Sequence, residues 1–413
     1  MRSGGTPSKE RVDYWNGTVP WASSKDLKVD ELHDTVDHVS ELAVQDGSAA
    51  VIAAGASLVV VRGMILAHSF PVVRTMRPMA INQDLKAILP RESVDSQFLS
   101  WLLRGSARES LSRLDEAAHG TKALRMEAWT SMELPIPPGD EQVLIWQFLD
   151  LETAKIDALL AEKERLITLL KEKRQAVISH AVTKGLNPDA PMKHSGIAGV
   201  GRVPAHWEVS KLKWVATMHS GHTPDKKIAA YWDGGDIPWV SLNDTGYLKE
   251  HEFIAETALS ITKAGIDGSS ARILPAGVVV FSRDATIGRC AITTRSMAVS
   301  QHFIAWECSG RILPRYLLLR MRSMGDEFDR LTTGATVKTI GMPEVRTLST
   351  PLPSIDEQLR IVDHVDRTTA MIDGLLNESA SAVQLLKERR AALITAAVTG
   401  QVDVRGLAPA EAA

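Results

Sequence analysis

The chain has 413 residues, of which 44% are hydrophobic, and its formal net charge is −3 at pH 7. These values exclude an intrinsically disordered chain and are typical of a packed protein with two or three domains. They also lack the overall basic excess of a dedicated nucleic-acid-binding domain. DNA binding would therefore need basic residues that cluster locally, or the basic surfaces of partner chains.

Residues 1–139 are predicted to form a first domain built mainly of short strands. This part is rich in Val, Trp and Gly, and its turn signals include Asn16-Gly17 and Asp46-Gly47. The longest apolar stretch, residues 49–67, is interrupted by Arg62 and by glycines, so it predicts a buried strand with turns rather than a membrane span. A helix is expected over residues 96–114.

Two long amphipathic helices are predicted over residues 140–183 and 355–400. Their apolar residues recur at spacings of three, four and seven, which is typical of a coiled-coil seam. A helix of about 40 residues spans about 60 Å, too long for one domain face to cover, so we expect the two helices to pair antiparallel. The alternative is that each helix lies along its own domain. The seam residues are expected to be Ile145, Leu149, Ile156, Leu159, Leu166, Leu170, Val177, Ile361, Val365, Ile372, Leu375, Leu386 and Leu393.

The remaining segments follow from composition. Residues 184–203 are rich in glycine and are predicted to be a linker. Residues 204–354 form a second domain, with a strand at 277–281 and a helix at 314–331, and residues 401–413 form a C-terminal tail.

The chain carries the same plan twice. Leu-Pro-Ile-Pro-Pro-Gly-Asp-Glu-Gln at 134–142 returns as Thr-Pro-Leu-Pro-Ser-Ile-Asp-Glu-Gln at 350–358, so that Glu141 and Glu357 are 216 residues apart. Leu-Leu-Lys-Glu-Lys-Arg at 169–174 returns at the same offset as Leu-Leu-Lys-Glu-Arg-Arg. Such a period is too long for a solenoid repeat of roughly 20–50 residues. The predicted fold class is therefore α+β, with two duplicated mixed α/β domains separated by two long antiparallel coiled-coil helices.

Further paired motifs lie inside the two domains. Ser-Gly-Gly-Thr-Pro at 3–7 is similar to Ser-Gly-His-Thr-Pro at 220–224, and Tyr-Trp…Pro-Trp at 14–21 returns at 231–239. Together with the duplicated helix starts, this ordered set resembles the specificity subunit of type I restriction-modification systems over nearly the whole chain. The run from Ser195 to Val209 also resembles that family's entry into its second half.

The resemblance implies a non-catalytic subunit that recognises DNA. Each of two target-recognition domains would bind one half of a split double-stranded site, and the helices would act as a spacer and as the docking surface for two methyltransferase subunits. Restriction-translocase subunits would complete the complex, and S-adenosylmethionine, ATP and Mg²⁺ are expected on the partner subunits, with no cofactor bound by this chain.

Catalytic and metal-binding patterns are missing from the sequence. There is no phosphate-binding loop of the Walker type and no Asn/Asp-Pro-Pro-aromatic methyltransferase motif. Cys290 and Cys308 form no C-x-x-C pair, the 12 histidines show no H-x-H or H-E-x-x-H spacing, and no signal-peptide core begins the chain. We expect a cytoplasmic protein without a metal site.

The competing functions are a coiled-coil scaffold that joins two protein-binding domains without DNA readout, and a stand-alone enzyme.

The two copies differ at their start. Sixteen residues, 204–219, precede Ser220 in the second domain, whereas only Met1 and Arg2 precede Ser3. We expect that the first domain has lost an opening strand and helix, or that its start lies upstream.

Candidate DNA contacts are basic, hydroxyl and glycine residues in loops, because arginine can donate to guanine and glycine allows phosphate to approach backbone N–H groups. The alternatives are a surface arginine, an internal ion pair or a simple turn. The paired tryptophans could stack on bases, but core packing is favoured. Because the loops differ between the domains, the half-sites should differ, giving an asymmetric target. The candidates are Ser3, Gly4, Thr6, Arg62, Gly63, Thr121, Lys122, Arg125, Ser220, Gly221, Thr223, Ser282, Arg283, Thr286, Thr336 and Lys338.

Overall fold

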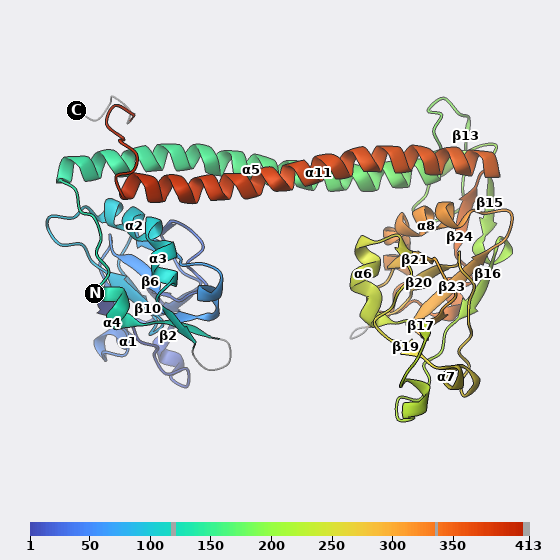
Figure 1. Cartoon of the computed structure of the whole chain (residues 1–413), viewed down its shortest axis with the longest axis horizontal. Helices are drawn as coiled ribbons and strands as arrows, with labels where there is room; N and C mark the ends of the chain where they lie inside the picture. Colours follow the sequence, from blue (N-terminus) through green and yellow to red (C-terminus); the bar gives the residue numbers. More distant parts are fainter. Residues whose placement is uncertain (117–120, 335–337, 408–413) are drawn as a thin grey trace. The chain divides into compact units, whose positions relative to one another are not determined.

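The computed structural model describes residues 1–116, 121–334 and 338–407. The chain divides into two compact units: the first contains Met1–Arg165 and Ala380–Ala413, and the second contains Leu166–Ser379 (Figure 1). Each unit therefore holds one mixed α/β domain together with one part of each long helix. The predicted duplication and fold class are confirmed.

The first domain is built on a five-stranded sheet whose central strand, β6 (Ser57–Val60), is entirely buried. All neighbouring pairs are antiparallel except β3 with β8. Apolar residues on both faces of these strands form the core. The sheet order is β1 (Arg2–Ser3), β10 (Leu85–Ile88), β6, β8 (Val72–Thr75) and β3 (Glu31–Leu32).

Two smaller sheets complete this domain. One has the order β4 (Asp37–Val39), β2 (Trp15–Ala22), β9 (Met79–Ile81) and β5 (Val51–Ile52). The other has the order β11 (Leu114–Glu116), β12 (Lys122–Leu124) and β7 (Arg62–Gly63). The short helices are η1 (Val12–Tyr14), α1 (Glu41–Gln45), η2 (Met64–Ala67) and α4 (Met126–Thr130).

The second domain repeats the main sheet, with a buried central strand β20 (Val279–Ser282). Its order is β16 (Ala216–Ser220), β23 (Phe303–Cys308), β20, β21 (Cys290–Thr293) and β18 (Phe253–Ile254). A second sheet has the order β19 (Ser260–Ile261), β17 (Ile237–Val240) and β22 (Ala298–Val299). The short helices are η4 (Leu212–Trp214), η5 (Ala229–Tyr231), η6 (Leu242–Asp244), α6 (Thr245–Glu250), α7 (Lys263–Asp267) and α10 (Met342–Val345).

Two additional strand pairs accompany the second domain. The linker forms a hairpin of β13 (Met192–His194) and β14 (Arg202–Pro204), and β15 (Glu208–Lys211) pairs with β24 (Ser349–Leu352). Residues 133–136, which precede the first long helix as β24 precedes the second, have no strand assignment. The segment that opens the second domain thus forms a strand pair that is not seen at this place in the first.

In each unit a short helix lies between the main sheet and the long helices (Figure 1). In the first unit this is α2 (Ser96–Gly105), which is capped by Asp95, whose Oδ1 accepts from the N–H groups of Gln97 and Phe98 at 2.8 and 2.9 Å. In the second unit it is α8 (Pro314–Arg322), which begins with proline at its first position. The apolar sides of α2 and α8 join the long helices to the domain cores.

The predicted helices over 96–114 and 314–331 are each interrupted. α3 (Ala107–Leu111) follows α2, and α9 (Gly325–Leu331) follows α8. Close packing accounts for the glycine that ends α2, because a Cβ added to Gly105 would lie 2.4 Å from Val398 Cγ2.

The long helices are α5 (Gly139–Lys184) and α11 (Ile355–Val398), close to the predicted bounds. In the first unit Arg390 Nε donates to Asp157 Oδ1 at 2.9 Å, and in the second unit Arg174 Nε donates to Asp373 Oδ1 at 2.8 Å. The two arginines are 216 residues apart, and so are the two aspartates. Each repeat thus gives an arginine to the other repeat and receives one, as in a twofold-symmetric dimer. The predicted antiparallel pairing is confirmed.

The predicted seam is correct in part. Ile145, Leu149, Ile156, Leu170, Ile361, Val365 and Ile372 are buried, and Val177, Leu386 and Leu393 are partly buried. The prediction was wrong for Leu159, Leu166 and Leu375, which are 46%, 38% and 50% exposed.

The error has a geometric cause. Each residue turns an α-helix by about 100°, so a leucine one position away from the seam lies on another face. Leu160 and Ile167, next to the exposed leucines, are the partly buried residues. A search for apolar spacing also misses polar seam positions such as Thr153, which is buried and donates to Leu149 O at 2.6 Å.

A buried glutamine fixes each long helix to its domain. Gln142 Oε1 accepts from Asp95 N at 2.8 Å, while Nε2 donates to Ser93 O and Pro137 O at 3.0 and 2.8 Å. Gln358 repeats this arrangement with Leu313 N, Arg311 O and Pro353 O. The glutamine of the Glu-Gln pair that marks both helix starts therefore holds together the Pro-x-Pro segment, the long helix and the residues before α2 or α8.

Replacing Gln142 with leucine should lower the free energy of unfolding by about 1–3 kcal/mol, because it leaves buried backbone groups without partners. Urea unfolding measures this loss. Gln384→Leu is the matched control, since Gln384 is exposed on α11 of the same unit and its side chain donates to Glu388 on its own helix, at 2.8 Å. Its effect should stay within about 0.5 kcal/mol. Equal effects of the two substitutions would contradict this anchoring role.

Candidate nucleic-acid interface

The turn that follows the central strand of the first domain brings together several predicted contacts. Lys122 pairs with Gly63, and Ala123 pairs with Arg62, where β12 adds to β7. Arg62 is exposed, and Arg125 Nε lies 3.5 Å from Asp115 Oδ1 on the neighbouring strand. Thr121 directly precedes β12. The structure thus places Arg62, Gly63, Thr121, Lys122 and Arg125 around one turn.

The second domain builds the same turn from its own segments. Asp284 and Thr339 form a β-bridge, and Ala285 N donates to Lys338 O at 2.9 Å. This pairing brings Ala285, and with it Thr286, beside Lys338, and Arg283 lies opposite Ile340. Ser282 is buried, and its hydroxyl donates to Asp284 O at 3.0 Å. Thr336 lies outside the described residues.

Backbone hydrogen bonds define which residues correspond between the two turns. Val61 N donates to Asp84 O at 2.8 Å, and Val61 O accepts from Leu124 N at 2.9 Å. Arg283 makes the equivalent bonds, donating to His302 O at 3.0 Å and accepting from Ile340 N at 2.9 Å. Arg283 therefore corresponds to Val61.

Arg62 is therefore not the counterpart of Arg283, although both arginines follow the central strand of their domain. Arg62 corresponds to Asp284, because the strand partners of these two residues, Ala123 and Thr339, are 216 residues apart. Arg283 is held within its domain: Nη1 donates to Ile340 O at 2.9 Å, and Nη2 lies 3.6 Å from Asp284 Oδ2. The alternative of an internal contact thus describes Arg283, whereas Arg62 remains a surface arginine.

Asp284 is a buried carboxylate that the sequence analysis did not single out. Its Oδ2 is hydrogen-bonded to His302 Nδ1 at 2.8 Å, and its Oδ1 accepts from the hydroxyl of Thr339. The next residue, Ala285, has a φ of 58°, a left-handed conformation that costs an L-residue roughly 1–2 kcal/mol. Such strain persists only where surrounding contacts enforce it, and it gathers at functional sites. A non-glycine residue in this conformation cannot be recognised from sequence.

The Ser-Gly-x-Thr-Pro segments lie at the edge of each main sheet. Ser3 pairs with Lys86 and accepts a hydrogen bond from its Nζ, and Thr6 donates to Gln83 Oε1. In the second domain Ser220 pairs with Ile304 on β23, and Thr223 is partly buried nearby in sequence.

Steric contact explains the glycine in these segments. A Cβ on Gly4 would lie 2.0 Å from Ile81 O, and a Cβ on Gly221 would lie 2.1 Å from Val299 O. The chain crosses a neighbouring strand at both places, so only glycine fits. Close approach to that strand is enough to account for both glycines without a bound phosphate.

The paired tryptophans stabilise the domains. Trp15 and Trp21 form an edge-to-face pair with ring centroids 5.1 Å apart, and Trp232 and Trp239 repeat it at 5.2 Å. Trp21 and Trp239 are buried, and each indole N–H donates to a carbonyl of the Ser-Gly-x-Thr-Pro segment, at 3.0 and 3.1 Å. The predicted core role is confirmed for these two residues.

The two cysteines and the possible metal ligands are further candidates for reactive groups. Burial raises the pKa of the Cys290 thiol to about 11 and that of Cys308 to about 12, so neither is a thiolate nucleophile near neutral pH. Within the described ranges no group of three or more His, Cys, Asp or Glu is placed to hold a metal ion. In the same part of the chain no helix has the length and apolarity to cross a bilayer.

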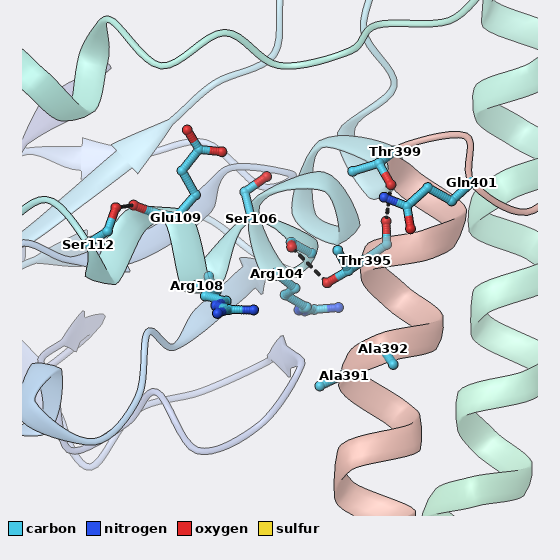
Figure 2. A pocket seen from close by; sticks show the side chains of 12 residues that line it. Arg104, Ser106, Arg108, Glu109, Ser112, Ala391, Ala392, Thr395, Thr399 and Gln401 are labelled. Atoms are coloured by element: carbon cyan, nitrogen blue, oxygen red, sulfur yellow. Dashed lines mark hydrogen bonds between the residues drawn. The ribbon is translucent and has the colours of Figure 1, made fainter.

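A surface groove of about 760 Å³ lies in the first unit between the α2–α3 turn and α11 (Figure 2). Its lining consists mostly of small and polar residues, and the charged side chains of Arg104 and Glu109 are engaged in the fold. Arg104 Nε donates to Val72 O at 3.1 Å, and Glu109 Oε1 accepts from Arg113 at 2.8 Å.

Comparison with known proteins identifies the class. The family model of the type I restriction modification DNA specificity domain matches residues 1–168 and 204–382. The chain belongs to this family, and the matched regions are its two specificity domains.

Individual proteins that are similar to this chain are also type I specificity subunits. The chain is 30% identical over 148 residues to the Escherichia coli type I restriction enzyme EcoR124I/EcoR124II specificity subunit, covering 36% of this chain and 37% of that protein. It is 29% identical over 229 residues to the Methanocaldococcus jannaschii type I restriction enzyme MjaIX specificity subunit, covering 54% of this chain and 50% of the relative. The matches thus span half or less of these relatives.

A solved structure concerned with complex assembly and conformational transition of the type I R-M system has the same fold. Its matched chain superposes with a TM-score of 0.71 at 16% identity, covering 97% of this chain and 95% of that one.

Proposed function

We propose that this protein is the DNA-specificity subunit of a type I restriction-modification complex, and that it recognises an asymmetric bipartite site through its two domains. The observation that carries the proposal is the turn after the central strand, which both domains build with the same backbone pairing and different side chains. Two turns with equivalent backbone pairing and different side chains would recognise two half-sites of different sequence.

The charge balance bears on how the complex would hold DNA. With a net charge of −3 the chain supplies little of the phosphate attraction that dominates DNA affinity. Basic surfaces of partner subunits would provide that attraction, while the local turns select bases.

The paired helices offer two related surfaces for methyltransferase subunits. Leu159 and Leu375 are exposed at equivalent positions of the two repeats, and so are Leu169 and Leu385. Large exposed apolar side chains that recur in this way favour protein contacts, and two copies would accept two similar subunits. Restriction-translocase subunits would join that assembly in the cytoplasm, with S-adenosylmethionine, ATP and Mg²⁺ on partner subunits and no catalytic centre in this chain.

The proposal predicts that the chain together with its methyltransferase subunits methylates one bipartite sequence, and that the subunits without the chain do not. Long-read sequencing of DNA from cells with and without the gene measures this. A coiled-coil scaffold that does not recognise DNA predicts the same methylation pattern in both cells. Methyl transfer or DNA cleavage by the purified chain alone would instead support a stand-alone enzyme.

The helices should also set the spacing between the half-sites, since α5 and α11 run through 46 and 44 residues without interruption. Inserting four residues into each helix at facing positions adds about 6 Å of helix, equivalent to one or two base pairs at roughly 3.4 Å each. The methylated site should then need a longer spacer. The same insertion after Asn187 in the linker serves as the control and should leave the site unchanged. An unchanged spacer in the helix variant would reject this role.

A further inference from the structure

The two turns differ most at one structurally equivalent position, which holds Arg62 in the first domain and Asp284 in the second. Both residues follow the central strand by the same path and pair with equivalent partners, Ala123 and Thr339. The strand pairing is therefore matched at this position, and the side chains carry opposite charges. The backbones diverge at the next residue, where Gly63 has a φ of 157° and Ala285 a φ of 58°.

In the first domain this position presents a cation to solvent. Arg62 is exposed, and no ion pair to it occurs across residues 1–116, 121–334 and 338–407. Met64, two residues further, is 71% exposed. A guanidinium is the commonest partner of guanine O6 and N7, and it can donate to both at once.

In the second domain the same position faces inward. Asp284 is buried, and its carboxylate is occupied by His302 and Thr339. Thr286 N donates to Asp284 O at 2.7 Å, which tightens the turn and leaves Ala285 and Thr286 exposed at its tip. A methyl group and a hydroxyl suit a thymine methyl and a base-edge acceptor, and they do not reproduce a bidentate guanine contact.

We infer that this position determines how the two half-sites differ. Arg62 is a specificity-determining residue that selects a guanine in one half-site. Asp284 is a positioning residue that holds the strained turn so that its tip faces the other half-site. The inference rests on the proposed function and assigns the chemistry by which each domain selects its half-site.

The first test uses the full chain in complex with its methyltransferase subunits and compares methylation of site libraries. Arg62→Ala should reduce discrimination at one base pair of one half-site by about 5- to 150-fold and leave the other half-site unchanged. Arg62→Lys, which keeps the charge without the planar fork, should lose less.

Arg91→Ala is the matched control. Arg91 is an exposed arginine that follows β10, whose Ile88 pairs with Ser57 at the start of β6, whereas Arg62 follows Val60 at the end of that strand. It therefore lies at the opposite end of the same strand pair and should leave the methylated sequence unchanged.

The second test addresses the positioning role. Asp284→Ala should relax selectivity in the other half-site alone, and Asp284→Asn, which keeps an acceptor for Thr339, should retain part of it. If Asp284→Ala does not fold, the selectivity of the Asp284→Asn variant alone tests whether Asp284 positions the turn.

Unaltered selectivity in Arg62→Ala, or effects of Arg62 and Asp284 variants in the same half-site, would overturn the inference. If the proposed function itself is wrong, the result is different, because the wild-type complex would then methylate no defined sequence.

Discussion

Reciprocal pairing between α5 and α11 is the constraint on which the rest of the structure depends. Each unit contains one Arg–Asp ion pair of the same kind, and in each the arginine comes from one repeat and the aspartate from the other. The apolar seam beneath these pairs supplies the stabilisation, because partly exposed ion pairs contribute only about 0.2–1 kcal/mol each. The ion pairs add a defined register, since a helix displaced by a few residues would lose both.

The domains are joined to this pairing by buried polar contacts. Gln142 and Gln358 each connect a long helix to the segment before α2 or α8, and the apolar sides of those short helices complete the cores. Movement of a long helix relative to its own domain would break buried hydrogen bonds, whose groups are costly to leave unpaired. The turn after β6 or β20 is thus built on a sheet that is itself held to the helix pair within each unit.

Much of this architecture could be predicted from the sequence because its signals are local or repeated. The helix bounds follow from proline before Asp-Glu and from apolar spacing, and the duplication follows from paired motifs. The assignment of Leu159, Leu166 and Leu375 to the seam failed because a leucine one residue from the seam gives nearly the same spacing pattern.

The candidate site was harder to predict because non-local pairing defines it. The equivalence of Arg62 with Asp284 depends on partners about 55–60 residues away along the chain, Ala123 and Thr339, which a linear comparison of the two strand ends does not reveal. The inward position of Asp284 and the left-handed backbone of Ala285 are likewise consequences of tertiary contacts. Gly4 and Gly221 were predicted as DNA contacts, and the close approach of a crossing strand accounts for both glycines.

The central claim is the reciprocal helix pairing, and a double-mutant cycle on Arg174 and Asp373 tests it most directly. Arg174→Asp and Asp373→Arg alone should each destabilise the second unit to urea, since each places like charges together. The double variant should recover most of the loss, with a coupling of about 0.5–1 kcal/mol for this partly exposed pair. Losses that simply add would contradict the account.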